Sequence, residues 1–449
     1  MFHKVKNNIG RGAGLAAVAV LLLLCLIGPA GGRALAQIGP GSPAETRAEP
    51  PGFPIDQVEE PTWKSAEPEE RAPVTLRRHD VIEANGWTIE TVDEGVDGSI
   101  DLSLDGEGNA HISYDAGALY CAQQAGGDWD RTMVDSPAYH TSIAVDPQGY
   151  DHILYFENNT RDDTLKYAYE DAEGWHVGAF DLSEIYLGRY NELAVDENGQ
   201  AHMTFSTWRC MGWVGGDCVS WDPDKLAYLL PVGDQWQIMV AGYSSEYGSL
   251  TLDAAGEAHI SFYNDYLESL KYTCYDIISV YPSSYEVDAS ADVGKYSSVA
   301  VDSQYTPPRP HLAYYDADHG DLKYAYGTGP DVWNLSWYSE TVDTGGAEGD
   351  VGQYTSLALD GDGYPHVSYY DVDGENLKYT YQDEDGWHPE TVDGAGDVGR
   401  WSSLAIDGAG NVHIAYYDAT NDTVKYAYEA SDGGEAEYRV YVPLVVRSR

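Results

Sequence analysis

The sequence predicts an all-β protein, a seven-bladed β-propeller whose blades are four-stranded antiparallel sheets. A unit of roughly fifty residues recurs seven times, most clearly over residues 387 to 429, and this period is typical of propellers. Each unit holds four short runs that are rich in aromatic and β-branched residues and bounded by Gly, Asp or Asn, as strands are. No window of the chain keeps a helical period of apolar residues.

An Asp-x-x-Gly-x-x-His motif joins two strand-like runs in each unit. Asp and Gly at this spacing are type I turn chemistry, so each copy is expected to close a hairpin. One His per unit at the same turn indicates a structural role, as a partner of the turn backbone or of the Asp, because histidines spread around a ring cannot converge on one metal ion. Regular copies begin at Asp105, Asp146, Asp196, Asp253, Asp360 and Asp407, and a copy with a Pro-rich insertion runs from Asp302 to His311.

The last unit lacks its fourth strand at the C-terminal side. The missing strand stands at residues 87 to 93, where Trp-Thr-Ile-Glu-Thr-Val-Asp matches residues 387 to 393 nearly residue for residue. We therefore expect this N-terminal strand to complete the last blade, which closes the ring and removes an open sheet edge.

The segments outside the repeats have compositions of their own. Basic residues, an apolar run over 13 to 27 and small residues before Gln37 are typical of a cleavable signal peptide, and the run is short for a membrane span. We expect a secreted, extracellular protein with no membrane span after cleavage. Many Pro and Glu residues then favour disorder. The expected order is a signal peptide at 1–36, a disordered linker at 37–80, the propeller at 81–430, and a linker with a short C-terminal tail at 431–449.

The cysteines divide into two pairs beyond the signal segment. Cys210 and Cys218 lie close together in a long insertion of the third unit, and in an exported protein this spacing predicts a disulfide. Cys121 and Cys274 fall in separate blades, too far apart to bridge, so they are expected to be buried thiols.

The charge balance excludes some partners. Acidic residues outnumber basic ones by 74 to 25, and the formal net charge is −49. Such a surface repels the phosphates of nucleic acids and of anionic membranes. The expected partners are an extracellular glycan or a protein, and the expected state is a monomer.

One position at the start of each inner strand is aromatic in six of the seven units. Inner strands line the channel of a propeller, so these side chains should ring its mouth, where aromatic rings with nearby polar groups suit sugars. The alternative is that they fill the channel or pack between blades. The candidate ligand-binding residues are Tyr190, Tyr247, Tyr296, Tyr354, Trp401 and its neighbour Arg400, while His140 holds the same position in the second unit and Ser99 in the first.

His140 also carries a catalytic hypothesis. With Tyr139 and Arg189 nearby, it has the residue types of a polysaccharide lyase, a base with a charge-neutralising partner. The alternative is that His140 is one more stacking ring.

Acidic loops carry a calcium hypothesis. Calcium prefers several oxygen ligands, often from alternating Asp residues in a short loop. The candidates are Asp316, Asp318, Asp371 and Asp373, although none lies in a full twelve-residue calcium loop and Asp-Gly turns are common without metal. No other cofactor is expected.

The repeat L-A-x-D-x-x-G-x-x-H, followed by Y-Y-D and L-K-Y-A-Y, resembles those of the sialidase-type or BNR-like propeller superfamily and of secreted bacterial propeller-repeat proteins. The resemblance covers about residues 81 to 430 and implies the propeller fold. His259 and His366 stand where the sialidase Asp-box has Trp, and the arginines are scattered, so sialidase activity is not implied.

These observations favour an exported binding or interaction module that recognises a glycan or polysaccharide on the channel-mouth face. Two alternatives remain, a carbohydrate-active enzyme (polysaccharide lyase or glycoside hydrolase) and a purely structural display module. Near-regular blades favour the readings without catalysis.

Overall fold

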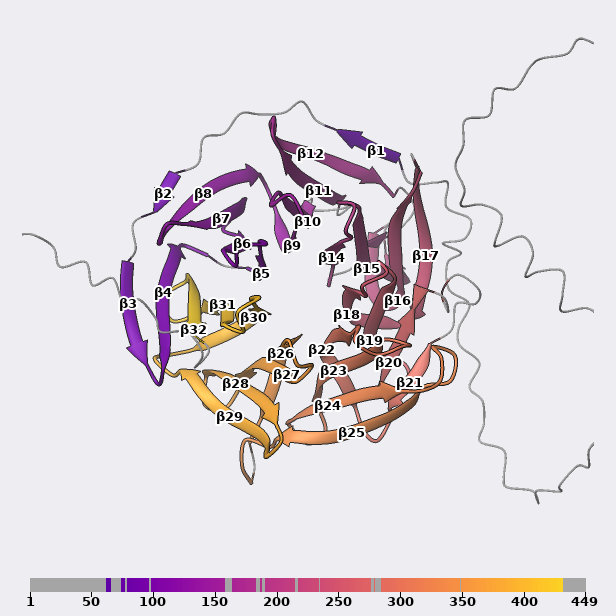
Figure 1. Ribbon diagram of the computed structural model, residues 1–449. Coiled ribbons are helices and arrows are strands. Elements are labelled where there is room, and N and C mark those ends of the chain that lie inside the picture. The colour runs from indigo at the N-terminus through magenta and orange to yellow at the C-terminus, as the bar shows by residue number, and fades with distance from the viewer. Residues whose placement is uncertain are drawn as a thin grey trace, which may run out of the picture. The chain divides into compact units, whose positions relative to one another are not determined.

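Seven antiparallel sheets form a ring in the computed structural model, which confirms the predicted seven-bladed β-propeller (Figure 1). The chain divides into two compact units, Met1–Pro51 and Gly52–Arg449, and every described residue belongs to the second. The structure describes residues 62–65, 74–76, 79–96, 98–157, 164–182, 186–187, 190–214, 217–233, 235–275, 278, 284–347 and 349–430.

Each blade runs from an inner strand beside the channel to an outer strand. Blade 1 contains β5 (Ile100–Leu104), β6 (Ala110–Asp115), β7 (Leu119–Ala125) and β8 (Asp128–Asp135). Blade 2 contains β9 (Tyr139–Val145), β10 (Asp151–Glu157), β11 (Thr164–Asp171) and β12 (Gly174–Asp181). Blade 3 pairs two short inner strands with a long hairpin and an outer strand: β13 (Tyr186–Leu187), β14 (Glu192–Val195), β15 (Ala201–Val214), β16 (Asp217–Val232) and β17 (Gln235–Tyr243).

Blades 4 to 7 are more regular. Blade 4 contains β18 (Ser245–Leu252), β19 (Ala258–Asn264), β20 (Ser269–Cys274) and β21 (Tyr285–Asp288). Blade 5 contains β22 (Val293–Asp302), β23 (Arg309–Asp316), β24 (Asp321–Thr328) and β25 (Ser336–Asp343). Blade 6 contains β26 (Val351–Leu359), β27 (Pro365–Asp371), β28 (Asn376–Asp383) and β29 (Gly386–Asp393). Blade 7 contains β30 (Val398–Ile406), β31 (Val412–Asp418), β32 (Thr423–Glu429) and, from the other end of the chain, β4 (Trp87–Glu94).

The ring closes as predicted, because β4 pairs antiparallel with β32, with Thr88 opposite Tyr428. Three further strands lie outside the blades (Figure 1). β3 (His79–Ala84) pairs with β4, β1 (Thr62–Ser65) pairs with β12, and β2 (Val74–Leu76) pairs with β8. The structure thus differs from the disordered linker expected at residues 37 to 80, because β1, β2 and the start of β3 lie in it. Backbone pairing with an exposed sheet edge requires no apolar side chains, and the rest of residues 37 to 80 lies outside the described residues.

The hydrophobic core lies between neighbouring blades. One cluster joins Leu154 and Phe156 of blade 2 to Met203 and Phe205 of blade 3, and all four are fully buried. Because both faces of a blade are covered, whole second strands such as β31 are buried without the alternation of a half-exposed strand.

The motif histidines stabilise this packing. His413 Nδ1 lies 2.6 Å from the hydroxyl of Tyr426, and its Nε2 lies 3.6 Å from the turn Asp407. The same tyrosine ring packs edge-on against Trp129 of blade 1, with centroids 5.2 Å apart. The structural role was therefore predicted correctly, but the closest partner is a tyrosine hydroxyl of the third strand rather than the turn backbone. Equivalent His–Tyr pairs are His152–Tyr167, His202–Tyr228, His259–Tyr272, His311–Tyr324 and His366–Tyr379.

Outer-strand aspartates link five of the blades to the next blade among the described residues. Asp393 at the end of β29 accepts hydrogen bonds from Tyr416 (2.8 Å) and Lys425 (3.0 Å) of blade 7. Burial opposes the charge of Asp393, but the Lys425 ammonium holds the pKa of this carboxyl below its usual value. Tyrosine and lysine or arginine of the following blade likewise bind Asp93, Asp135, Asp288 and Asp343, whereas Phe205 and Phe262 replace the tyrosine in blades 3 and 4.

Two cysteines are buried free thiols, as predicted, and Cys210 is disulfide-bonded. The side chain of Cys218 lies outside the described part of the chain, so the Cys210–Cys218 pairing stays a prediction. Cys121 replaces the usual tyrosine in blade 1, and there His111 Nδ1 instead lies 2.7 Å from the buried Asp151. Within the described residues, no helix is long and apolar enough to cross a membrane.

Replacing Trp87 by Ala should destabilise the closed ring. The Trp87 side chain is 0 % exposed and donates from Nε1 to Glu390 at 2.9 Å, and removing a buried Trp costs about 3–5 kcal/mol. Guanidinium unfolding measures the loss of unfolding free energy, with Trp333→Ala as a matched control because Trp333 is 44 % exposed. An unchanged transition midpoint for Trp87→Ala would contradict the closure described above.

The buried histidines should make the propeller sensitive to mild acid. Burial, with the nearby Arg309 charge, lowers the pKa of His311 from 6.5 to about 4. The unfolded chain therefore takes up this proton first, so the stability from the neutral ring is complete above pH 6.5 and is lost as the pH falls toward 4. His311→Asn should flatten this dependence by up to about 1.4 kcal/mol per pH unit, measured by denaturant unfolding at several pH values. If the unfolding free energy of His311→Asn depended on pH as steeply as that of the wild type, the prediction would be refuted.

Candidate binding site at the channel mouth

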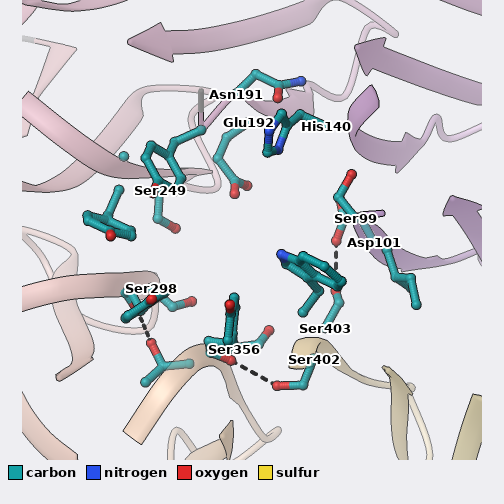
Figure 2. A pocket seen from close by; sticks show the side chains of 18 of the residues that line it. Ser99, Asp101, His140, Asn191, Glu192, Ser249, Ser298, Ser356, Ser402 and Ser403 are labelled. Atoms are coloured by element: carbon teal, nitrogen blue, oxygen red, sulfur yellow. Dashed lines mark hydrogen bonds between the residues drawn. The ribbon is translucent and has the colours of Figure 1, made fainter. Parts of the chain in front are cut away.

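The inner strands start at one mouth of the channel, and their first residues surround a pocket of about 220 Å³ (Figure 2). At or near the start of each inner strand lies the residue that is aromatic in six of the seven units, and we call it the mouth residue of its blade. The mouth residues are Ser99, His140, Tyr190, Tyr247, Tyr296, Tyr354 and Trp401, all half-buried, so the structure brings the predicted aromatic residues together as expected. Their role in binding stays a prediction.

Five mouth residues form a continuous aromatic arc from blade 3 to blade 7. Each ring contacts the next at angles between 37° and 66°. Burial raises the pKa of Tyr247, Tyr296 and Tyr354, so their hydroxyls stay protonated at neutral pH. The ring centroids are 4.2 Å apart for Tyr190–Tyr247, 4.7 Å for Tyr247–Tyr296, 4.7 Å for Tyr296–Tyr354 and 5.9 Å for Tyr354–Trp401.

The aromatic mouth residues share an unusual backbone conformation. From His140 to Trp401 their φ angles lie between 50° and 65°, a left-handed region that costs a residue with a side chain about 1–2 kcal/mol. The next blade holds this conformation in place. Ser402 Oγ donates to the carbonyl of Tyr354 at 2.9 Å, and Ser297 Oγ donates to that of Tyr247 at 3.0 Å. The strain is therefore stabilised blade by blade and keeps the rings at the mouth.

Two positions after the mouth residue in the sequence, each inner strand carries a polar residue that we call a floor residue. An inner strand is the edge of its sheet, so its outward backbone N–H groups need other partners. Floor residues of the preceding blade accept these groups at six of the seven blade junctions. The pairs are Ser403–Leu102 (3.1 Å), Asp101–Ile143 (2.8 Å), Ser142–Leu193 (3.1 Å), Ser249–Val299 (3.2 Å), Ser298–Leu357 (3.0 Å) and Ser356–Leu404 (2.9 Å).

Among the floor residues, Asp101 accepts the most hydrogen bonds. Its two oxygens accept four hydrogen bonds, from the N–H groups of Leu102 and Ile143 and from the hydroxyls of Ser142 and Ser403, at 2.7 to 3.0 Å. Burial raises the pKa of Asp101, although these hydrogen bonds oppose the shift. The carboxyl group is thus fully used in holding blades 7, 1 and 2 together.

Glu192 is the floor residue at the seventh junction, between blades 3 and 4, and it departs from the pattern. Its carboxyl projects into the cavity between His140 and Ser249 (Figure 2) and forms no hydrogen bond with any described residue. Burial, and then the charge of Asp101, raise the pKa of Glu192 well above 4.5. The raised pKa favours the protonated form, which can both donate and accept a hydrogen bond.

The other predicted site residues lie elsewhere. Arg400 forms an ion pair with Asp397 at 2.7 Å and does not line the pocket. Tyr139 packs against Phe156, with centroids 5.9 Å apart, and does not line the pocket either. Of the three residues in the lyase hypothesis, only His140 is placed in the pocket, and Arg189 lies outside the described residues.

Carboxylate oxygens in the acidic loops accept hydrogen bonds from backbone N–H groups of the same loops. Asp316 Oδ1 accepts from the N–H groups of Asp318 and His319 at 3.2 Å, and Asp371 Oδ1 accepts from Gly374 at 2.8 Å. In the described ranges, no group of three or more His, Cys, Asp or Glu side chains is placed to hold a metal ion. The loops containing Asp318 and Asp373 therefore support no metal proposal.

Sequence reasoning missed both floor carboxyls, Asp101 and Glu192. The signal was present, because the floor position is Ser in five of the seven units and is acidic only in these two. It was hidden by the aromatic residues two positions earlier, whose pattern was easier to see.

No protein-family model and no curated protein sequence matches the chain. Solved structures of other propellers do. The Aleuria aurantia lectin, in complex with Fucα1-6GlcNAc, is 12 % identical, with 66 % of this chain and 96 % of the lectin covered and a TM-score of 0.44. YCF48 from Cyanidioschyzon merolae is 9 % identical, with 77 % and 99 % covered and a TM-score of 0.46. The leech intramolecular trans-sialidase is 12 % identical, with 80 % and 70 % covered and a TM-score of 0.39. At these values no function follows from the similarity.

Glu192→Gln should stabilise the protein at neutral pH and not in acid. The folded state disfavours the carboxylate, so wild-type stability falls as the pH rises above 4.5 toward the raised pKa, whereas the amide has no such loss. Calorimetric melting at pH 4.5 and pH 8 should show a higher Tm for the variant only at pH 8. Equal Tm differences at both pH values would contradict a raised pKa of Glu192 in the folded protein.

Proposed function

We propose that the protein is a secreted, monomeric glycan-binding propeller that holds one sugar ring of an extracellular glycan at its channel mouth without cleaving it. The observation that carries the proposal is the unbroken aromatic arc above a polar floor in which Glu192 has no partner among the described residues. The pocket measures about 220 Å³, below the roughly 300–1,000 Å³ of sites for whole small molecules, so it suits part of a longer ligand.

The arc supplies the apolar half of a sugar site. Sugar rings present C–H faces, which pack on aromatic rings, and the arc from Tyr190 to Trp401 offers such surfaces around more than half of the mouth. Its hydroxyl groups are protonated and positioned by neighbouring rings.

The floor supplies the polar half. Ser249, Ser298 and Ser356 use an oxygen lone pair for the backbone of the next blade, and their hydroxyl hydrogens have no acceptor among the described residues. The Glu192 carboxyl adds a further polar group on the same side of the pocket. Sugar hydroxyls, which both donate and accept, match this set.

The same geometry argues against hydrolysis. A glycoside hydrolase needs two carboxyl groups that act as an acid and as a base or nucleophile. Glu192 has the raised pKa of an acid, but the lone pairs of Asp101 are taken by four hydrogen bonds that link blades. Asp101 is thus a structural group, and the pocket binds without reacting.

The full chain, incubated with a panel of oligosaccharides and polysaccharides, should be retained by at least one of them and release no shorter product. Trp401→Ala should weaken retention about tenfold, since a lost aromatic contact of about 1.4 kcal/mol corresponds to that factor. Trp333→Ala is the control, because it removes an exposed aromatic ring far along blade 5 from the pocket.

Each outcome separates the alternatives. Release of oligosaccharide would overturn the proposal in favour of a lyase or hydrolase and direct attention to His140 and Glu192. No retention on any saccharide would also overturn it and favour a protein partner or a structural display role. Retention that Trp401→Ala and Glu192→Gln leave unchanged would place the glycan away from the mouth.

A further inference from the structure

A second pocket, of about 560 Å³, lies between blades 5 and 6. Its walls come from the β22–β23 turn, from β25, and from the β26–β27 turn. The mouth residue Tyr296 is near the start of β22, whereas Asp302 in this pocket ends that strand. The second pocket therefore opens on the face opposite the channel mouth.

The irregular turn of blade 5 builds one wall of the second pocket. Its Pro-rich insertion contributes Tyr305 and is followed by Arg309, both of which line the pocket. Ser303 Oγ accepts a hydrogen bond from Ala254 N–H of blade 4 at 3.1 Å, and Gln304 Nε2 donates to the Gly361 carbonyl of blade 6 at 3.0 Å. The insertion is thus held from both sides.

Two exposed tyrosines give the second pocket an aromatic platform. Tyr305 is 48 % exposed and Tyr338 is 54 % exposed, both high for large aromatic side chains. Tyr326 stacks on one face of Tyr338, with centroids 5.2 Å apart and planes 18° from parallel. This stack fixes the ring and leaves its other face for a ligand.

Arg309 is the cation of the second pocket. Its guanidinium lies 3.6 Å from the centroid of the Tyr305 ring and forms no ion pair with any described residue. Arg131 and Arg400, by contrast, pair with Asp93 and Asp397 at 2.6 and 2.7 Å. Five N–H donors fixed in place beside an open aromatic platform are suited to a ligand's oxygen atoms.

Two acceptors, Glu340 and Asp362, also line the second pocket. Glu340 is already bound to the indole N–H of Trp387 at 2.9 Å, which fixes its position. Asp362, on the turn of blade 6, receives no hydrogen bond on its carboxylate from the described residues. The second pocket thus holds both donors and acceptors beside its aromatic rings.

We propose that this second pocket binds a neutral saccharide, with a sugar ring on Tyr338 and sugar hydroxyls between Arg309 and Asp362. Neutral sugars fit best because three carboxylates, Asp302, Glu340 and Asp362, line the pocket and the whole protein carries a net charge of −49, which repels anionic ligands. The inference goes beyond the channel-mouth function and does not depend on it.

Affinity electrophoresis of the full chain tests this inference, in native gels cast with a galactomannan, a mixed-linkage β-glucan or an α-glucan, and with polygalacturonate as the acidic probe. At least one neutral polysaccharide should retard the protein. Tyr338→Ala and Arg309→Gln should each weaken the retardation about fivefold or more, while Trp333→Ala, an exposed ring on the same blade outside the pocket, should not. Circular dichroism and melting confirm that the variants fold.

The outcomes distinguish the two sites. Loss of retardation in Tyr338→Ala but not in Trp401→Ala supports the second pocket even if the channel-mouth proposal fails. Retardation unchanged in both pocket variants overturns the inference, as does no retardation in any neutral gel. Retardation by polygalacturonate alone, lost in Arg309→Gln, overturns the neutral class and assigns the pocket to acidic sugars.

Discussion

The propeller depends on satisfying the exposed backbone of its innermost strands. Seven inner strands converge on the channel, and each is a sheet edge whose N–H groups have no neighbouring strand. Floor side chains such as Ser356 and Asp101 accept these groups from the next blade, so the hydrogen bonds that complete one sheet also fix its angle to its neighbour. The outer aspartates, such as Asp393, repeat the arrangement farther from the axis.

Both sets of hydrogen bonds, from the floor residues and to the outer aspartates, are interrupted around blades 3 and 4. Blades 3 and 4 carry Phe205 and Phe262 where other blades carry the tyrosine that binds an outer aspartate, and Glu192 replaces the floor serine between them. Glu192 forms no hydrogen bond between blades among the described residues, and burial raises its pKa. The proposed binding residue therefore lies where the structural repeat is broken, as expected when local rules are relaxed for function.

Repetition explains which features could be predicted from the sequence. Period, turn motif and the misplaced strand at 87 to 93 determine the ring and its closure, because each is a local pattern copied seven times. Glu192 and the pocket around Arg309 could not be predicted in the same way. Glu192 differs from Asp101 because no described residue forms a hydrogen bond with its carboxyl, which only the structure reveals. The second pocket joins turns that are roughly sixty residues apart, from Asp302 to Asp362. The pairing of β1 and β2 was equally hidden, since backbone pairing leaves no mark on composition.

Closure of the ring by β4 and β32 also determines when the native fold can form during synthesis. β4 is among the first strands made, yet its partner is the last strand of the ring, more than three hundred residues later. Until synthesis reaches Thr423, β4 has no β32 to pair with and blade 7 has an open edge. The native ring therefore cannot form during translation of its first six blades. In a protein with this topology the ring stays open until the final strand has been synthesised.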